Sequence, residues 1–331
     1  MSTVTQSNPS QPIRIANVIG GHIHPSICAT RSGDLLVVYN KEGGGGVELL
    51  LSRSGDGGRT WSDSEPIPVI RNCSIYPGSL TTLGDGRILL NWSCYRDAGD
   101  KLWRQPQFSM SCDDGETWSD PRDYPISDCS NYTCMRHGVL EWEADEWLCP
   151  FYDRSVLYNA RTHKISAFGD GRNHGMVPIV RTSQGTLISG APQTVATVPV
   201  GVPGNMVRGL RSIDKGLTWE ALNYFPHFGV AGYDLSVLNN GRVILTYIVY
   251  GVGVDGEFSY EIAQSRDDGK TWDFDTAYEV HNPGRRIMGR GWPRTVQIDN
   301  ETLGTIFYDL DAEQPGGPGV FIIRTPLSDL G

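Results

Sequence analysis

One eight-residue pattern, S-x-D-x-G-x-T-W, constrains the fold of this chain more than any other feature. It occurs at residues 54–61, 111–118, 212–219 and 265–272. In such a stretch the Asp carboxylate can accept hydrogen bonds from nearby backbone N–H groups, and the Gly can adopt a positive φ. The Thr and Trp then begin a β-strand whose indole packs between neighbouring sheets. The pattern therefore predicts repeated copies of one β-hairpin, and it indicates a role in folding rather than in catalysis.

A second repeat predicts the number of structural units. An apolar strand, a small turn and another apolar strand recur six times, and the first strands begin near His24, Tyr76, Arg136, His174, Tyr233 and Trp292. The gap between the second and third copies of the eight-residue pattern is about twice as long as the other gaps, and the degenerate stretch 158–165 lies where a lost copy is expected. Repeated units of four short strands are typical of propeller blades. We therefore expect an all-β fold, a six-bladed β-propeller of four-stranded antiparallel blades.

The domain boundaries follow from these units. Residues 13–331 are expected to form a single propeller domain, because strong turn signals continue into the last unit. A strand at residues 13–18 would add the outer strand of the last blade and close the ring, which removes exposed sheet edges. Residues 1–12 are polar and are expected to be a disordered lead-in.

Composition restricts the partners and the location. The net charge of −10 argues against nucleic acid or an anionic membrane as a partner, and no apolar run reaches the roughly 18 residues of a membrane span. Residues 1–12 lack the features of a signal peptide, which favours a cytoplasmic location. The seven cysteines show no metal-binding spacing and are expected to be reduced, although Cys129 and Cys134 could approach each other. No cofactor is indicated, and the oligomeric state is left open.

Propeller topology predicts where a site can lie. In each blade the first strand is innermost, and its start faces one mouth of the central channel together with the loops between the second and third strands. The eight-residue turns lie on the far side near the rim, so they are expected to be remote from any catalytic centre. Ionisable and aromatic residues gather at the mouth, where the loops include Tyr95, Tyr152 and Tyr250. The candidate catalytic residues are His24, His137, Asp153, Tyr233 and Asp234. The candidate substrate-binding residues other than arginines are Glu42, Tyr76, His174 and Trp292.

Arginines form the rest of the candidate substrate-binding set. Those assigned to the mouth are Arg96, Arg136, Arg154, Arg208, Arg290 and Arg294. Several guanidinium groups that converge on one mouth would bind a carboxylate in bidentate fashion. This indicates a sialic acid or a uronic acid as the sugar that is bound.

In its repeated turns the chain resembles the Asp-box (BNR repeat) proteins of the sialidase superfamily, which are β-propellers. Sialidases of this type open their first inner strand with Arg-Ile-Pro, where this sequence has Ile23-His24-Pro25. The family's acid/base Asp lies in the loop of blade 1, and the only carboxylate in that loop of this chain is Glu42. The family's nucleophilic Tyr opens the last blade. This chain has Trp292 there, and the nearest Tyr of that kind is Tyr233, one blade earlier.

The first hypothesis for the function is a sialidase-like glycoside hydrolase that cleaves a terminal, anionic sugar at the mouth. Such a reaction needs an acid that protonates the leaving oxygen and a base or nucleophile on the opposite side. The groups assigned to these roles are Asp153 with His24, His137 or His174, and Tyr233 paired with Asp234. A Tyr can be the nucleophile where the carboxylate of the substrate would repel an Asp or Glu.

Two other functions fit the same mouth. A polysaccharide lyase acting on a uronate would take its base, its acid and its carboxylate-binding cation from His24 or His137, Tyr233 or Tyr76, and Arg136. A non-catalytic carbohydrate-binding propeller is the second alternative, because this fold hosts many functions. His22 and His24 could also begin a metal site with His137 or His174, although no metal is assigned to the chain.

Overall fold

The eight-residue turns fold alike in the computed structural model. In the first turn Ser54 Oγ donates to Asp56 Oδ1 at 2.8 Å and accepts from the backbone N–H of Gly58 at 2.8 Å. The backbone N–H and the hydroxyl of Thr60 donate to the Asp56 carboxylate at 2.9 and 2.7 Å. The same bonds between Ser, Asp, Gly and Thr recur in the turns of Asp113, Asp214 and Asp267. The repeated pattern thus builds one turn four times.

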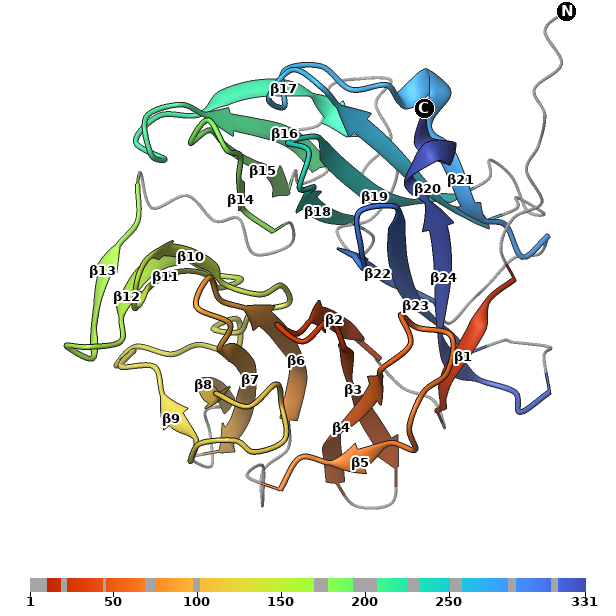
Figure 1. Ribbon diagram of the computed structural model, residues 1–331. Coiled ribbons are helices and arrows are strands. Elements are labelled where there is room, and N and C mark those ends of the chain that lie inside the picture. Colours follow the sequence, from red (N-terminus) through yellow and green to blue (C-terminus); the bar gives the residue numbers. More distant parts are fainter. Residues whose placement is uncertain are drawn as a thin grey trace, which may run out of the picture.

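The strands on either side of these turns form four-stranded antiparallel sheets that surround a central axis as blades (Figure 1). The structure describes residues 11–18, 23–43, 46–68, 75–97, 102–169, 178–192, 207–225, 233–250, 258–284, 290–310 and 315–331. Blade 1 contains β2 (Ser26–Ala29), β3 (Leu35–Gly43), β4 (Gly46–Ser54) and β5 (Glu65–Pro66). Blade 2 contains β6 (Ile75–Thr82), β7 (Ile88–Asp97), β8 (Leu102–Ser111) and β9 (Arg122–Asp123). Blade 3 contains β10 (Leu140–Glu143), β11 (Glu146–Pro150), β12 (Ser155–Asn159) and β13 (Lys164–Ala167).

The remaining blades have the same design. Blade 4 contains β14 (Val180–Arg181), β15 (Leu187–Pro192), β16 (Val207–Ser212) and β17 (Glu220–Phe225). Blade 5 contains β18 (Tyr233–Val237), β19 (Val243–Tyr250), β20 (Phe258–Ser265) and β21 (Tyr278–His281). Blade 6 contains β22 (Arg290–Gln297), β23 (Thr302–Asp309), β24 (Gly319–Pro326) and β1 (Ile13–Asn17). The short 3₁₀ segments η2 (Phe274–Thr276) and η3 (Leu327–Leu330) interrupt this β structure. The predicted six-bladed β-propeller is confirmed.

The closing strand and the degenerate turn also lie where they were expected. β1 pairs antiparallel with β24, with Ile13 opposite Ile322, so the first strand of the chain completes the last blade (Figure 1). The stretch 158–165 is the β12–β13 turn, the position that the eight-residue turns occupy in other blades. It is closed by Asn159 Oδ1, which accepts from the N–H and the hydroxyl of Thr162, both at 3.0 Å.

The inner strands of blades 3 and 4 differ from the predicted starts near residues 136 and 174. They begin later, at Leu140 and Val180. The ladder between β10 and β11 starts at the pair Leu140–Leu148, so residues 136–139 lie outside that ladder and precede the strand.

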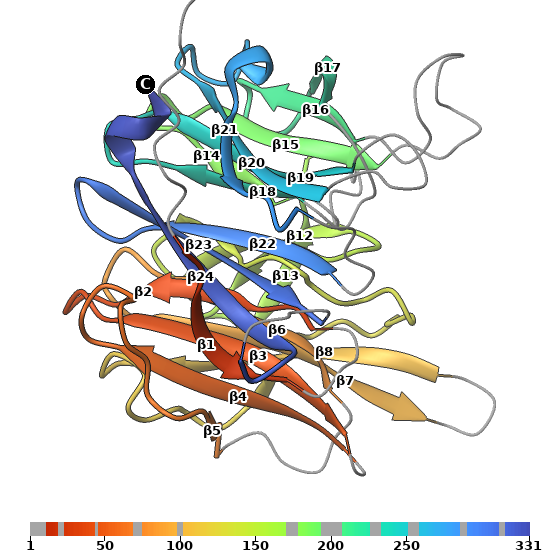
Figure 2. The same cartoon turned by 90° about the vertical axis from the view of Figure 1, so that its right-hand side faces the viewer.

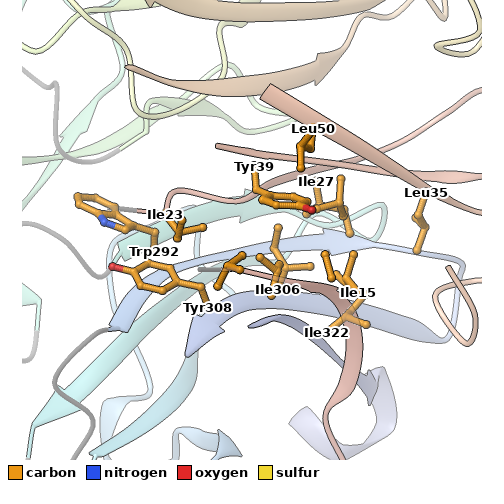
Figure 3. Packing of buried hydrophobic residues seen from close by; sticks show 14 residues of the cluster. Ile15, Ile23, Ile27, Leu35, Tyr39, Leu50, Trp292, Ile306, Tyr308 and Ile322 are labelled. Carbon is orange, nitrogen blue, oxygen red and sulfur yellow. The ribbon is translucent and has the colours of Figure 1, made fainter. Parts of the chain in front are cut away.

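The core lies between neighbouring blades, because side chains alternate along each strand and both faces of a blade are covered. Leu35 and Tyr39 of β3 belong to a cluster with residues of β23 and β24 in blade 6, and Figure 3 shows this packing. Leu36 and Val38 of the same strand belong to a cluster with β7 of blade 2. Each blade is therefore held by two apolar interfaces, and these fix the ends of the inner strands around the axis.

The cysteines depart from the expectation of reduced thiols. Cys94 is in a disulfide bond, so the expectation is wrong at this position. Among the described residues the free cysteines are Cys28, Cys112, Cys129, Cys134 and Cys149. Within the same part of the chain, no helix has the length and apolar character needed to cross a membrane.

Candidate functional site at the mouth of the propeller

One face of the ring collects the starts of the inner strands and the ends of the second strands. The β7–β8 hairpin projects from this face (Figure 2). A β-bulge in β22 places Trp292 there, because the register with β23 shifts between Gly291 and Arg294. Trp292 has a φ of +48°, which is rare for a bulky residue. Bulges of this kind redirect side chains, often beside active sites.

The indole of Trp292 begins a row of stacked side chains. Its ring centroid lies 4.3 Å from that of His24, which comes from blade 1. The Arg136 guanidinium carbon lies 4.3 Å from the centroid of Trp292 and 5.5 Å from that of Tyr152. Tyr152 in turn stacks on Tyr132, with centroids 5.6 Å apart and planes 22° apart. We name these five residues the aromatic row.

A buried polar cluster lies beside this row. Arg294 Nε is 3.3 Å from Asp234 Oδ1, and Arg294 Nη1 is 3.2 Å from His137 Nδ1. Asp234 Oδ2 accepts the backbone N–H of Thr295 at 2.8 Å. Burial raises the pKa of the Asp234 carboxyl above its usual value, and the Arg294 guanidinium opposes this rise. We refer to His137, Asp234 and Arg294 as the buried cluster.

The buried cluster and the aromatic row are joined through the backbone. Arg294 Nη1 donates to the carbonyl oxygen of Arg136 at 3.2 Å. Because an arginine can only donate, Nδ1 of His137 is an acceptor toward it, and the proton of a neutral His137 lies on Nε2. Four of the candidate residues, from three different blades, therefore belong to one contact network, which continues through Trp292 to His24.

The buried cluster also borders the central channel. A cavity of about 410 Å³ is lined by inner-strand residues from every blade, including Asp234 and Arg294. The other lining residues continue along β18 and β22 toward the far face, through Ser236 and Val296. Asp234 and Arg294 thus lie where the mouth narrows into the channel.

Asp153 lies just after the end of β11 and is fixed by a neighbouring loop. Its Oδ2 accepts from the hydroxyls of Ser130 and Thr133 at 2.9 and 2.8 Å. Arg154 lies 3.3 Å from the same oxygen and makes two bonds of 2.8 Å to the carboxylate of Asp128. The Asp153 side chain is 18% exposed, so the carboxylate is held in one orientation and is still reachable from solvent.

Tyr233 and Asp234 are neighbours in β18 and point to opposite faces of the blade. Tyr233 is buried against Phe225 of blade 4, with ring centroids 6.2 Å apart, whereas Asp234 faces Arg294 of blade 6. Tyr233 lies opposite Tyr247 in the ladder. The Tyr247 hydroxyl donates to Glu261 Oε2 at 2.7 Å, and burial together with this carboxylate raises the pKa of the Tyr247 hydroxyl.

The sequence did not single out every one of these groups. Tyr132 was missed, since it lies in the long connection between β9 and β10, which has no strand or turn repeat to mark it. The Tyr247–Glu261 pair was also missed, because it requires the register of β19 against β20.

Other candidate residues are placed by the backbone alone. Glu42, Tyr76, Arg96 and Arg290 belong to β3, β6, β7 and β22, but their side chains lie outside the described part of the structure. Arg208 lies in β16, opposite Ala191. His174 and His22 fall outside the described residues. Within the part that is described, no group of three His, Cys, Asp or Glu side chains could hold a metal ion.

Neither family models nor curated proteins match this chain. Solved structures match over nearly its whole length. A protein of unknown function from Dyadobacter fermentans DSM 18053 is 18% identical with a TM-score of 0.66, and the match covers 96% of this chain and 98% of that one. The NanB sialidase from Streptococcus pneumoniae is 11% identical with a TM-score of 0.67, over 99% of this chain and 72% of that one.

A second glycosidase shares the fold. The α-L-arabinofuranosidase Arb93A from Fusarium graminearum is 13% identical with a TM-score of 0.67, over 98% of this chain and 99% of that one. At such identities the likeness shows the fold. The chain is therefore a six-bladed β-propeller whose structural neighbours include sialidases and an arabinofuranosidase.

Proposed function

We propose that this protein is a glycoside hydrolase that releases a terminal, carboxylate-bearing sugar at the mouth of the propeller. The observation that carries the proposal is the contact of Arg136 with Trp292 and Tyr152, together with the hydrogen bond from the buried cluster to the Arg136 carbonyl. Neighbours in fold that include sialidases and an arabinofuranosidase support a sugar as the substrate. The eight-residue turns support membership of the Asp-box sialidase superfamily.

Arg136 is the proposed carboxylate-binding group. Its guanidinium carbon lies 4.3 Å from the ring centroid of Trp292 and 5.5 Å from that of Tyr152. A guanidinium held against aromatic rings can still bind a carboxylate in bidentate fashion through the N–H groups at the edge of its plane. A sialic or uronic acid carries the carboxylate that this geometry suits, on a ring that can rest against the neighbouring aromatic side chains.

Asp153 is the proposed base or nucleophile. Its carboxylate is oriented by the hydroxyls of Ser130 and Thr133 and by Arg154. The proposed proton donor is an imidazole, either His24 beside Trp292 or His137 in the buried cluster. An acid that protonates the leaving oxygen and a carboxylate on the other side of the sugar are the two groups that hydrolysis needs.

The test is to incubate the protein with sialosides, uronides, arabinofuranosides and neutral glycans and to follow the products by NMR. We expect release of a free terminal sugar from an anionic substrate. Asp153→Asn should then lower kcat/KM by at least about a hundredfold, because it removes a group that acts directly on the reaction. Asp85→Asn is the control, since Asp85 pairs with Arg87 in the β6–β7 turn, away from the mouth, and is 49% exposed, and it should stay within a few-fold of the wild type.

Three outcomes would contradict the proposal. An unsaturated sugar product would identify a lyase, and binding without any product would identify a carbohydrate-binding propeller. Full activity in the Asp153→Asn variant would remove Asp153 from the reaction.

A further inference from the structure

The outer end of the aromatic row is exposed to solvent. Tyr132 is 58% exposed, although it is a large hydrophobic residue. It stacks nearly parallel on Tyr152, with planes 22° apart. Tyr152 in turn contacts Arg136, so the exposed ring continues directly from the proposed carboxylate-binding group. Exposed aromatic surface next to a site commonly marks a place where a ligand binds.

The backbone holds Tyr132 in this position. Its N–H donates to Ser130 Oγ at 3.0 Å, and its carbonyl accepts from Cys134 N at 2.9 Å. The Cys134 carbonyl accepts from Tyr152 N at 2.8 Å, which ties the two stacked residues together through the main chain. The backbone is therefore fixed at Tyr132, and the ring itself is supported by its stacking on Tyr152, which lowers the entropy cost of ordering it when a ligand binds.

Polar groups lie in the loop that carries Tyr132 and in the residues that contact this loop. Ser130, which accepts from Tyr132 N, donates its hydroxyl to Asp153 Oδ2 at 2.9 Å. Asp128 and Arg154 form an ion pair beside the same loop, with side chains 72% and 31% exposed. A flat apolar face with charged hydrogen-bonding groups in the same loop complements a sugar, whose ring faces are C–H surfaces and whose hydroxyls point outward. A protein partner would instead be indicated by a larger contiguous apolar patch.

We propose that Tyr132 and Tyr152 form a second sugar-binding subsite, which holds the sugar unit next to the one that is cleaved. The subsite selects oligosaccharides over simple glycosides of the same terminal sugar. Tyr132 supplies the stacking surface, and the Asp128–Arg154 pair supplies hydrogen bonds to hydroxyls. This inference rests on the proposed function, because it takes Asp153 and Arg136 to mark where the bond is broken.

The experiment compares matched pairs of substrates. For sialic acid, glucuronic acid and arabinofuranose, the methyl glycoside and an oligosaccharide with the same terminal sugar are each assayed with the full chain. In the wild type we expect kcat/KM for the oligosaccharide to exceed that for the methyl glycoside by about tenfold or more, the size of effect that truncating an aromatic anchor commonly has. Tyr132→Ala should abolish this advantage, and its kcat/KM for the methyl glycoside should stay within about twofold of the wild-type value.

Two further variants serve as controls. Tyr132→Phe keeps the ring and should retain the advantage of the oligosaccharide. Leu217→Ala removes another exposed apolar side chain, 67% exposed, from the eight-residue turn of blade 4. This variant should leave kcat/KM unchanged for both substrates. The inference is overturned if the wild type shows no preference for the oligosaccharide, or if Tyr132→Ala lowers kcat/KM equally for both substrates.

A failure of the proposed function gives a different result, namely no cleavage of any pair. The same oligosaccharides are then titrated by saturation-transfer NMR. Binding that weakens about tenfold in Tyr132→Ala supports the subsite, and absent or unchanged binding overturns it.

Discussion

Replacing Gly115 by Ala should destabilise the propeller and leave its activity unchanged. Gly115 lies in the turn after β8 with a φ of +88°, and a Cβ there would lie 2.6 Å from Cδ1 of Leu36, a fully buried residue of blade 1. Left-handed backbone costs an L-residue about 1–2 kcal/mol, and overpacking adds about 1–3 kcal/mol. The expected loss in the free energy of unfolding is therefore about 2–5 kcal/mol.

Alanine variants at two other glycines separate the cost of backbone strain from the cost of overpacking. Gly185 has a φ of +84°, and a Cβ added there would meet no heavy atom of the described residues within 4 Å. Gly185→Ala should therefore lose the strain alone, about 1–2 kcal/mol. Gly58 also has a φ of +84°, and its nearest contact would be Ile322 Cδ1 at 3.2 Å. Gly58→Ala should therefore fall between the other two variants.

Urea unfolding followed by tryptophan fluorescence measures these differences. Adding Leu36→Val to Gly115→Ala removes the clashing atom, so the double variant should be more stable than the sum of the single losses by about 0.5–3 kcal/mol. At a temperature where all variants are folded, kcat/KM should be unchanged, because these turns lie away from the mouth. Equal losses at the three glycines, or additive effects at Gly115 and Leu36, would refute the reasoning that the turn of Gly115 packs tightly against Leu36 of the neighbouring blade.

Two further predictions concern charge. Hydrogen bonds from Thr117 lower the pKa of Asp113 to about 2. Since the folded pKa is depressed, this stabilisation is present above the unfolded value of about 3.9 and is lost as the pH falls through about 2. In Asp113→Asn the free energy of unfolding should therefore depend less on pH between about pH 5 and pH 2, as measured by urea unfolding. A pH dependence equal to that of the wild type would contradict this prediction. Arg136→Met should lower kcat/KM about a hundredfold for a carboxylate substrate and far less for the analogue reduced to the alcohol, and equal losses would exclude carboxylate binding.

The architecture could be predicted because its signals are local. Each eight-residue turn contains all the donors and acceptors that close it, as Ser54, Asp56 and Thr60 show. The same local chemistry identifies the degenerate turn at Asn159 and Thr162, where a side-chain amide takes the place of the Asp carboxylate. Six repeated blades close into a ring, and the first strand of the chain can complete the last blade. For this reason β1 was correctly assigned to blade 6.

The site could be predicted only in part, because its contacts depend on long-range register and on one irregular backbone. The order of the strands predicts which residues lie at the mouth, and it correctly placed His24, Arg136 and Trp292 on the same face. The bulge that turns Trp292 onto Arg136 was not predicted, although Gly291 and Pro293, which flank Trp292, are residues that often mark a bulge within a strand. The alternation of side chains along a strand is enough to predict that Tyr233 and Asp234 point to opposite faces. The sequence interpretation had nevertheless paired these two residues, and the structure separates them.

The buried cluster favours a positioning role for Arg294 over direct contact with substrate. Arg294 is 13% exposed, and its guanidinium contacts the Asp234 carboxylate, Nδ1 of His137 and the carbonyl of Arg136. A substrate carboxylate at Arg294 would have to displace Asp234, and breaking a buried pair costs about 3–5 kcal/mol. Arg136 is only half-buried and stacks on the aromatic row, so a carboxylate can approach it without displacing Asp234. Arg136 is therefore the better candidate for the proposed carboxylate-binding group, and Arg294 donates to its backbone carbonyl.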